Sequence, residues 1–526
     1  MAFHNLSVCL PLPATSSTAA ILCIFFSFFF IWFSHNRRIR ARLPPGPYAL
    51  PIIGNLHQLV LPAHRTFKSL ADKYGPIFFL RLGSVPTVVV SSSEIAKQFL
   101  KNHDLIFASR PPRAAGRLIF FNFEDVVFAP YGEHWRQMRK ICVLELLTAK
   151  RIESFKHVRE EEVSSMIRSV WEESENGRMG VNVSKAISTL TSNIVWRILA
   201  NRKFSDDDLG GDFKGFKDLL VELIARVGDF NIGDFIPYLD WLDLQGINRC
   251  MKKIHKTFDE FAEKIIDDHV NANHLMAAAS NGQKRADAEP HVQDFVDVLL
   301  HMAVTDTKIT RETIKALVLD MFGAGLETTS TTLEWAMSEL LRHPHVMKKL
   351  QEEIESIVGH HGKVKGSNLA TMKYLHCVVK ETLRLYPAVP LMVPHESVEA
   401  VTIAGYYIPK KTTVMVNVWA IGRDPNVWGA YASKFKPERF MEYEQINLTD
   451  QSDFSMIPFG AGRRGCPGAS MAIPTIELAL AQLLHTFDWR VEGDPSQLDM
   501  KEVCGVTIPR QVPLCAYPRL RVSFPL

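Results

Sequence analysis

One cysteine, Cys466, lies in a glycine-rich stretch whose composition suits a metal-bound cofactor. Residues 458–468 read PFGAGRRGCPG, so four glycines surround the sulfur. Because glycine has no Cβ, such a loop lets the backbone approach a flat ligand closely and leaves N–H groups free to point at the sulfur. Hydrogen bonds to a thiolate tune the potential of a bound metal. Arg464 adds a positive charge that can pair with an anionic edge of the ligand.

A second chemical pattern places an acid next to a hydroxyl in the middle of a predicted helix. Residues 324–329 read AGLETT, so Gly325 precedes the pair formed by Glu327 and Thr328. Glycine inside a helix costs ~1 kcal/mol relative to alanine, but it allows a ligand to come close to the helix. The Thr328 hydroxyl is expected to donate to the carbonyl oxygen four residues earlier. The pair can supply protons to a ligand, and ordinary interior packing is the alternative explanation.

Two further pairs of polar residues have helical spacing. Glu381 and Arg384 are three residues apart, and Trp135 and Arg139 are four apart, so each pair shares one helix face. The first spacing is typical of a weak surface ion pair. In the second pair, an indole N–H and a guanidinium can both reach the carboxylates on one edge of a ligand. Taken alone, that spacing is also what an ordinary surface helix shows.

The elements that must position these residues are mainly helical. The pattern of apolar residues and helix-stopping prolines predicts a long helix over 310–342 and another to about Val358. Further helices are expected over 372–386 and 469–486. Residues 145–301 read as mainly helical. The fold class is therefore predicted to be mainly α with a minor β-sheet region.

The β-rich runs are short. Residues 77–82 and 87–90 predict a hairpin around Gly83 and Ser84. Two more strands are expected at 398–403 and 412–418, around a turn at Ala404 and Gly405. A polar segment at 281–290 predicts a surface loop. No internal linker separates the body into several domains.

The first 50 residues differ from the rest. Residues 19–33 read AAILCIFFSFFFIWF, no charge lies between 6 and 18, and arginines follow at 37, 38, 40 and 42. An uncharged run extended upstream suits a bilayer span, and the positive cluster is expected to stay cytosolic. A cleaved signal peptide would need positive charge before the run. The predicted organisation is a lumenal tail at 1–18, a transmembrane anchor at 19–36, a basic and proline-rich elbow at 37–50, and a single domain at 51–526.

Composition narrows the classes of function. The net charge is only +3 and no long basic face accompanies it, so no nucleic-acid partner is expected. The eight cysteines include no C-x-x-C pair, which argues against a zinc module and a dense disulfide scaffold. A chain of 526 residues is long enough to bury a large core and a ligand cavity.

The chain resembles the cytochrome P450 family from the proline-rich elbow to the carboxyl terminus. The strongest match is the pattern F-x-x-G-x-R-x-C-x-G, which runs from Phe459 to Gly468. The resemblance implies a haem b whose iron is bound by the thiolate of Cys466. It also implies that Phe459 packs beside the sulfur and that Arg464 pairs with a haem propionate.

The same resemblance gives roles to polar residues in other parts of the chain. Glu327 and Thr328 match the family's oxygen-activation motif and would deliver protons there. Trp135 and Arg139 would bind haem propionates, and His395 occupies a position where relatives place a propionate-binding His or Arg. These five residues are therefore expected around one cofactor.

A structural network is implied as well. Glu381, Arg384 and Arg439 are expected to join in a buried ion-pair network that holds the core near the haem. The sequences at 437–440 (PERF) and 458–460 (PFG), with the anchor and the elbow, are similar to the plant A-type microsomal branch of the family.

The resemblance implies a membrane-bound haem-thiolate monooxygenase with a cytosolic catalytic domain in the endoplasmic reticulum membrane. It would use O2 and take electrons from NADPH-cytochrome P450 reductase. Walls are expected at 111–128, 317–327, 388–394 and 505–508, and their side chains are mostly apolar. Such a pocket suits a small hydrophobic substrate, either a terpenoid or a phenolic or phenylpropanoid metabolite.

Two alternatives stay open at this point. A haem-thiolate isomerase or dehydratase uses no O2 and has no need of the acid and hydroxyl at 327 and 328. A non-catalytic membrane haem-binding protein would need neither the proton path nor an enclosed apolar pocket.

Overall fold

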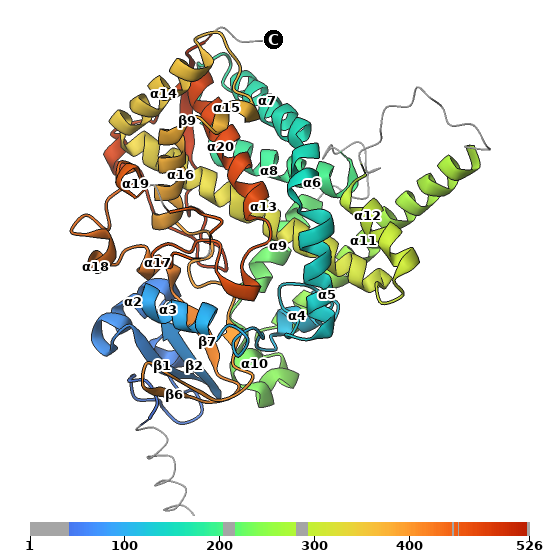
Figure 1. Cartoon of the computed structure of the whole chain (residues 1–526), viewed down its shortest axis with the longest axis vertical. Coiled ribbons are helices and arrows are strands. Elements are labelled where there is room, and N and C mark those ends of the chain that lie inside the picture. The colour runs from blue at the N-terminus through green and yellow to red at the C-terminus, as the bar shows by residue number, and fades with distance from the viewer. Residues whose placement is uncertain (1–41, 203–215, 280–292, 444–445, 451, 523–526) are drawn as a thin grey trace, which may run out of the picture.

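The computed structural model describes residues 42–202, 216–279, 293–443, 446–450 and 452–522. Helices dominate this part of the chain and three small sheets accompany them (Figure 1), as predicted for the fold class. The helices of at least eight residues are α2 (Ala63–Tyr74), α5 (Glu133–Ile141), α7 (Lys156–Glu173), α8 (Val183–Ala200), α9 (Phe216–Val227), α11 (Ile247–Ala279), α12 (Phe295–Thr305), α13 (Arg311–Arg342), α14 (Pro344–Val358), α16 (Lys373–Leu385) and α20 (Ala469–Thr486).

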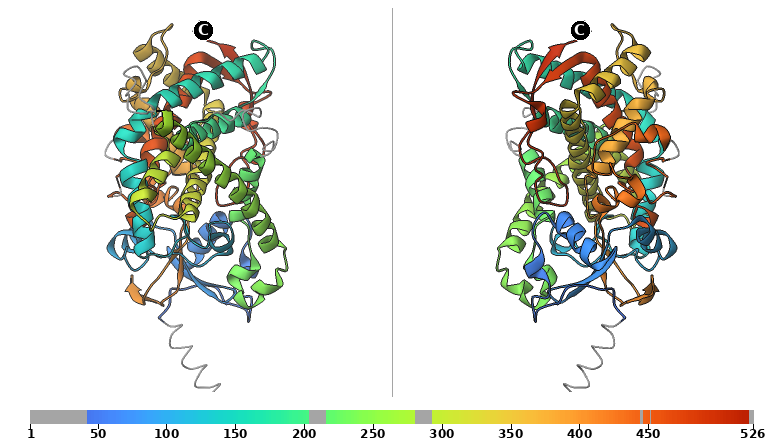
Figure 2. Two further views of the ribbon diagram at one scale, coloured as in Figure 1. Left: turned by 90° about the vertical axis from the view of Figure 1, so that its right-hand side faces the viewer. Right: turned by 90° about the vertical axis from the view of Figure 1, so that its left-hand side faces the viewer.

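The strands form sheets of four, three and two. The largest has the order β1-β2-β7-β4, in which β2 and β7 are parallel and the other neighbours are antiparallel. This sheet lies at one end of the molecule and β9 lies near the other (Figures 1 and 2). The strands are β1 (Ile77–Leu82), β2 (Val85–Val90), β3 (Val181–Asn182), β4 (His395–Glu396), β5 (Val401–Ile403), β6 (Tyr406–Ile408), β7 (Thr413–Val416), β8 (Phe487–Arg490) and β9 (Cys515–Leu520).

Helix α13 is the central element of the helical part. Its N-cap, Thr310, accepts a hydrogen bond from the N–H of Thr313, and the helix ends before Pro344, as predicted. Most of its residues are buried because α8, α16 and α20 pack against different sides of it. At Gly325 a Cβ would lie 2.9 Å from Val195 of α8. The glycine is therefore needed for close packing of two helices, in addition to the ligand approach that the sequence suggests.

One strand pairing was predicted wrongly. The hairpin at 77–82 is confirmed, but the strand that follows the Ala404-Gly405 turn is β6, not the run at 412–418. That run contains β7, whose four residues are all buried between β2 and β4. Its pairing with β2, which lies far away in the sequence, is decided by tertiary packing and not by a local turn.

Several predictions fall outside the described residues. They are the lumenal tail at 1–18, the anchor at 19–36, positions 37–41 of the elbow and the loop at 281–290. Within the described ranges, every helix is too short or too polar to cross a bilayer.

Candidate active site

A cavity of about 290 Å³ lies between α13, the N-terminal end of α20 and the loop at 458–468. The structure brings together around it all the residues that were predicted to bind a cofactor, together with Thr328. The members of that predicted set on its wall are Trp135, Arg139, Thr328, His395, Phe459, Arg464 and Cys466. Glu327 does not line it.

The loop that carries Cys466 is fixed by short-range geometry. The N–H of Cys466 donates to the carbonyl oxygen of Phe459 at 2.8 Å, which closes the loop into a tight turn. Gly462 has φ +70°, and a Cβ there would lie 2.3 Å from the carbonyl oxygen of Leu100. Only glycine fits this position, because both the backbone angle and the neighbouring backbone exclude a side chain. The glycine spacing of the sequence therefore follows from close backbone packing.

The sulfur of Cys466 sits just before α20, whose first residue is Ala469. The accessible surface of this side chain faces the cavity. The surrounding protein nevertheless shields the sulfur from bulk water, and this burial raises the pKa of the thiol. The N–H groups of Gly468 and Ala469, together with Arg139, act in the opposite direction and stabilise the thiolate. Burial prevails, as it does at the buried thiols of Cys142 and Cys377, so it is the position of Cys466 on the cavity wall that marks it as a candidate ligand.

One wall of the cavity is unusually rich in buried cations. Burial lowers the pKa of Arg110 to about 9, and burial together with the charge of Arg110 lowers the pKa of Arg464 to about 8. Burial and the same arginines lower the pKa of His395 well below its ordinary value. Asp125 is the carboxylate that counters the two arginines. A flat ligand with an anionic edge fits this wall, because it would supply the missing negative charge.

The hydrogen bonds of these groups hold them toward the cavity. Arg464 donates to the carbonyl oxygens of Ala108 and Ala129 at 2.6 and 2.5 Å, and its guanidinium lies 4.2 Å from the centre of the Trp135 ring. The Nδ1 atom of His395 contacts the carbonyl oxygen of Phe107 at 2.8 Å, so Nε2 remains for a ligand. Backbone carbonyls thus orient these side chains, and Asp125 is the carboxylate that offsets the charge of the two arginines.

The pair Trp135 and Arg139 lies on α5, one turn apart, as the spacing predicted. Trp135 donates to the carbonyl oxygen of Val126 at 3.0 Å, and Arg139 donates to the carbonyl oxygen of Gly465 at 2.5 Å. The second contact joins α5 directly to the cysteine loop.

On α13, Thr328 and Glu327 point in different directions. The hydroxyl of Thr328 donates to the carbonyl oxygen of Ala324 at 2.6 Å, which confirms the bond expected to the residue four positions earlier. Glu327 instead accepts a hydrogen bond from Thr507 at 2.7 Å. Burial raises the pKa of Glu327, and this hydrogen bond opposes the shift. The acid and the hydroxyl are neighbours in sequence without being bonded to each other.

The three residues predicted to form a buried network are in contact. Glu381 accepts from Arg384 at 2.7 and 2.8 Å and from Arg439 at 3.0 Å. The side chains of Glu381 and Arg384 are fully buried. This network lies outside the cavity wall, so its position agrees with a structural role.

The apolar wall matches the sequence prediction only in part. Of the expected side chains, Val389 and Met392 line the cavity, whereas Ile119, Phe322 and Ile508 belong to the packed core. The wall also includes residues of α8 that were not anticipated, because nothing in a helix sequence shows which of its faces meets a distant cavity. These are Thr191, Ile194 and Val195.

Two polar residues of the wall were also missed. Arg110 has no motif of its own and reaches the site through a loop. Asp320 lies on α13, two turns before Thr328, and accepts a hydrogen bond from the N–H of Val126 at 2.6 Å. Burial and the nearby Asp125 raise the pKa of Asp320 well above its ordinary value. The apolar helix residues around Asp320 gave no signal for its role.

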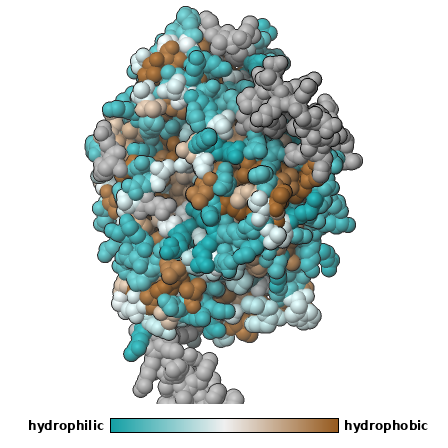
Figure 3. All heavy atoms as spheres, turned by 45° about the vertical axis from the view of Figure 1, so that its right-hand side comes forward, coloured by the Kyte–Doolittle hydropathy of each residue, from teal (hydrophilic) through white to brown (hydrophobic). Residues whose placement is uncertain are grey.

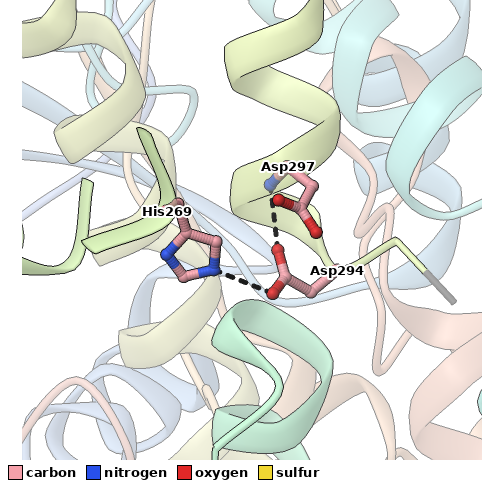
Figure 4. A group of neighbouring side chains, drawn as sticks. All are labelled: His269, Asp294 and Asp297. Atoms are coloured by element: carbon pink, nitrogen blue, oxygen red, sulfur yellow. Dashed lines mark hydrogen bonds and ion pairs between the residues drawn. The ribbon is translucent and has the colours of Figure 1, made fainter. Parts of the chain in front are cut away.

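A separate cluster joins α11 to α12 (Figure 4). Asp294 accepts from the N–H of Asp297 as the N-cap of α12 and lies 2.9 Å from Nε2 of His269, whose Nδ1 contacts the carbonyl oxygen of Ile265. Each oxygen of Asp294 therefore has a partner within the protein. This group is a helix cap with a buried ion pair, and its bonds are complete without a metal.

This ion pair predicts a pH-dependent contribution to stability. Burial would lower the pKa of His269, but the hydrogen bond and charge of Asp294 prevail and raise it. The stabilisation is fully present below the ordinary histidine pKa and is lost as the pH rises through the folded value. We expect His269→Gln to cost about 1 kcal/mol at pH ~6 and much less at pH ~9. Equal losses in denaturant unfolding at both pH values would contradict this.

Comparisons with known proteins all match one family. A family model described as Cytochrome P450 matches residues 44–515. "Cytochrome P450 750A1" of Pinus taeda is 66% identical over 528 residues, which cover 99% of each chain. "Cytochrome P450 71A1" of Persea americana is 44% identical over 94% of this chain and 96% of its own. "Flavonoid 3'-monooxygenase" of Arabidopsis thaliana is 42% identical over 93% of this chain and 94% of its own.

Proposed function

Because the chain belongs to the cytochrome P450 family, we propose that it hydroxylates a small hydrophobic plant metabolite at the microsomal membrane. As a member of that family it is a haem-thiolate monooxygenase that needs O2, a small-molecule substrate and a redox partner. When bound, the haem supplies the activation of O2. The observation that carries the proposal is a cavity that has a cysteine sulfur at one face and a cation-rich wall beside it.

The first part of the proposal concerns the cofactor. Cys466 would supply the thiolate that holds the haem iron, since its sulfur faces the cavity and two backbone N–H groups point at it. Phe459 packs beside the sulfur and holds water away from it. The cationic wall would hold the anionic edge of the haem through Arg110, Arg139, His395 and Arg464. Trp135 would support Arg464 with its ring, because its indole N–H is bonded to the carbonyl oxygen of Val126.

The second part concerns protons. Thr328 holds a hydroxyl at the cavity face of α13, and Glu327 holds a carboxyl just outside the cavity. Burial keeps this carboxyl easier to protonate than an exposed one, which suits a group that must both take and release a proton. We assign proton delivery to this pair.

Removal of the Thr328 hydroxyl tests this assignment. We expect Thr328→Ala to lower the product formed per NADPH roughly tenfold, with the lost electrons appearing as hydrogen peroxide. The measurement is product, peroxide and NADPH consumption in one assay. Ser330→Ala is the matched control, because its hydroxyl also bonds to α13 backbone but does not line the cavity. Unchanged coupling in Thr328→Ala would place proton delivery elsewhere.

The substrate class follows from the wall. Apart from the cation-rich edge, the cavity is bounded mainly by apolar side chains, among them Val195, Val389 and Met392. This favours a terpenoid or a phenolic or phenylpropanoid molecule with few polar groups. The name of the Arabidopsis thaliana relative, a flavonoid 3'-monooxygenase, supports the phenolic class.

The third part concerns the membrane. Large apolar side chains are exposed near the start of the described chain and around the short helix η4 (Pro237–Leu242), and Trp241 is 80% exposed. Both regions meet beside β1 and β2, where the N–H of Ser84 donates to the carbonyl oxygen of Phe235. Figure 3 displays an apolar patch near this end of the molecule. An anchor at 19–36 would place this end at the bilayer.

We therefore propose a single-pass protein of the endoplasmic reticulum membrane. Its tail at 1–18 is lumenal, its elbow at 37–50 is cytosolic, and residues 51–526 form one haem-binding catalytic domain. NADPH-cytochrome P450 reductase is the electron donor in this scheme.

Residues 460–465 read GAGRRG and so fit the G-x-G-x-x-G pattern of dinucleotide-binding loops. That pattern requires a strand just before the loop and a helix that begins within it. Here the described residues just before the loop form no strand, and α20 begins only after the cysteine.

Reconstitution tests the proposed reaction. Purified protein, reductase and NADPH are incubated with a panel of terpenes and phenolics, after substrates have been ranked by their ligand-induced Soret shift. Hydroxylated product that depends on NADPH supports the proposal. Rearranged product without NADPH would indicate an isomerase or dehydratase, and tight haem with no turnover of any ligand would indicate a binding protein.

A further inference from the structure

Thr507 makes a buried contact that the cofactor motifs do not include. Its hydroxyl donates to a carboxylate oxygen of Glu327 at 2.7 Å, although the two residues are 180 positions apart. Thr507 is 7% exposed, so the contact is shielded from bulk water. A hydrogen bond to a carboxylate is stronger than one between neutral groups, and burial strengthens it further.

The residue that follows Thr507, Ile508, is held in place by two hydrogen bonds. The N–H of Ile508 donates to the carbonyl oxygen of Ala388 at 3.2 Å, and the indole of Trp335 donates to the carbonyl oxygen of Ile508 at 2.8 Å. The Trp335 ring is itself stacked on Tyr386, with ring centres 4.4 Å apart. The hydroxyl of Thr507 is therefore presented to α13 by a fixed backbone.

Glu327 depends on this contact for its orientation. In the part of the chain that the structure describes, its carboxylate forms no ion pair and accepts no other side-chain hydrogen bond. The neighbouring Thr328 cannot hold it, because the Thr328 hydroxyl is bonded to the carbonyl oxygen of Ala324. Burial raises the pKa of Glu327, and Thr507 is the group that acts against this shift, with no charged group contributing.

We propose that Thr507 is a positioning residue for proton delivery, because its hydroxyl holds the carboxyl of Glu327 just outside the cavity. This inference rests on the proposed function, in which Glu327 moves protons. A buried carboxylate can be oriented by an ion pair with a cation, and here a neutral hydroxyl orients it by a hydrogen bond instead. Thr507 does not touch the cofactor site and acts only through Glu327.

The test compares variants of the haem-loaded protein. Thr507→Val removes the hydroxyl at nearly constant size, and Thr507→Ser restores it. The first readout is the carboxylic-acid C=O band of Glu327 in an infrared pH titration, assigned by its loss in Glu327→Gln. We expect Thr507→Val to move this titration to higher pH and Thr507→Ser to return it toward the wild-type position.

The second readout is the pH profile of product formation and its coupling to NADPH. In Thr507→Val, the part of the pH profile that follows the ionisation of Glu327 should move to higher pH. The product formed per NADPH should fall roughly fivefold, and both effects should be reversed in Thr507→Ser. Val506→Ala is the matched control, because it alters the same loop but keeps the hydroxyl. A Thr507→Val protein with a wild-type titration and profile would overturn the proposal.

The two hypotheses fail in different ways. If the infrared titration moves but Glu327→Gln leaves coupling unchanged, the carboxyl is held by Thr507 but is not a proton donor, and both the assignment of Glu327 and the present inference are wrong. If Glu327→Gln lowers coupling and Thr507→Val does not, the assignment of Glu327 stands and Thr507 has no part in it. The carbon-monoxide spectrum of each variant verifies that the fold is intact.

Discussion

Cys466→Ala is expected to abolish the strongly red-shifted Soret band that the reduced, carbon-monoxide-treated protein should give. That band depends on a thiolate bound opposite the carbon monoxide, and Cys466 is the cysteine that lines the cavity. Alanine leaves the loop geometry intact, since the hydrogen bond to Phe459 comes from the backbone N–H of residue 466. The measurement is a reduced carbon-monoxide difference spectrum of protein expressed with a supply of haem precursor.

Cys142→Ala is the matched control for this experiment. Cys142 is fully buried, and like Cys466 it is close enough to Arg139 for the two to interact electrostatically, but it does not line the cavity. It should therefore retain the red-shifted band with full intensity. A retained band in Cys466→Ala, or its loss in Cys142→Ala alone, would refute the ligand assignment.

The second large effect is expected in the buried network. Glu381→Gln should lower the free energy of unfolding by about 3–5 kcal/mol, because it leaves two buried guanidinium groups without their anion. Glu381 accepts bonds from Arg384, from Arg439 and from the backbone N–H of Lys436 at 2.7 Å. Since it does not line the cavity, any haem-loaded protein that is recovered should keep a thiolate-type spectrum.

A graded comparison keeps this prediction testable if the glutamine variant does not fold. Arg439→Lys preserves the charge but loses the bonds that the guanidinium donates to the carbonyls of Trp428 and Tyr431, so an intermediate loss of thermal stability is expected. The exposed pair formed by Lys348 and Glu352 on α14 serves as control, since Glu352→Gln should change stability by less than ~0.5 kcal/mol. Equal effects in the buried and exposed pairs would contradict a structural network.

How much of the site could be predicted depends on how local the signal is. The loop around Cys466 and the pair of Glu327 and Thr328 are continuous in sequence, so their geometry follows from glycine freedom and helix periodicity. The contact of Thr507 with Glu327 has no such signal, because it joins a loop and a helix far apart in the chain. The same holds for Arg110, which reaches the cavity only once the strands and helices have assembled.

The fold shows the same division. The boundaries of α13, α16 and α20 agree with prediction to within about a residue, since caps and prolines mark helix ends locally. The pairing of β7 was missed because strand neighbours are chosen by tertiary packing. The run at 412–418 carries no mark that distinguishes an inner strand beside β2 from the second arm of a hairpin.

The cationic wall also bears on how the mature protein is made. Arg110 and Arg464 repel each other across a buried surface, and Asp125 offsets only part of that repulsion. Folding that buries these arginines before the porphyrin binds has an electrostatic free-energy cost. The carboxylates of the porphyrin remove this cost when they bind beside the arginines. Because this cost disappears when the porphyrin binds, porphyrin binding is expected to stabilise the closed surface, so that haem content and thermal stability should rise together.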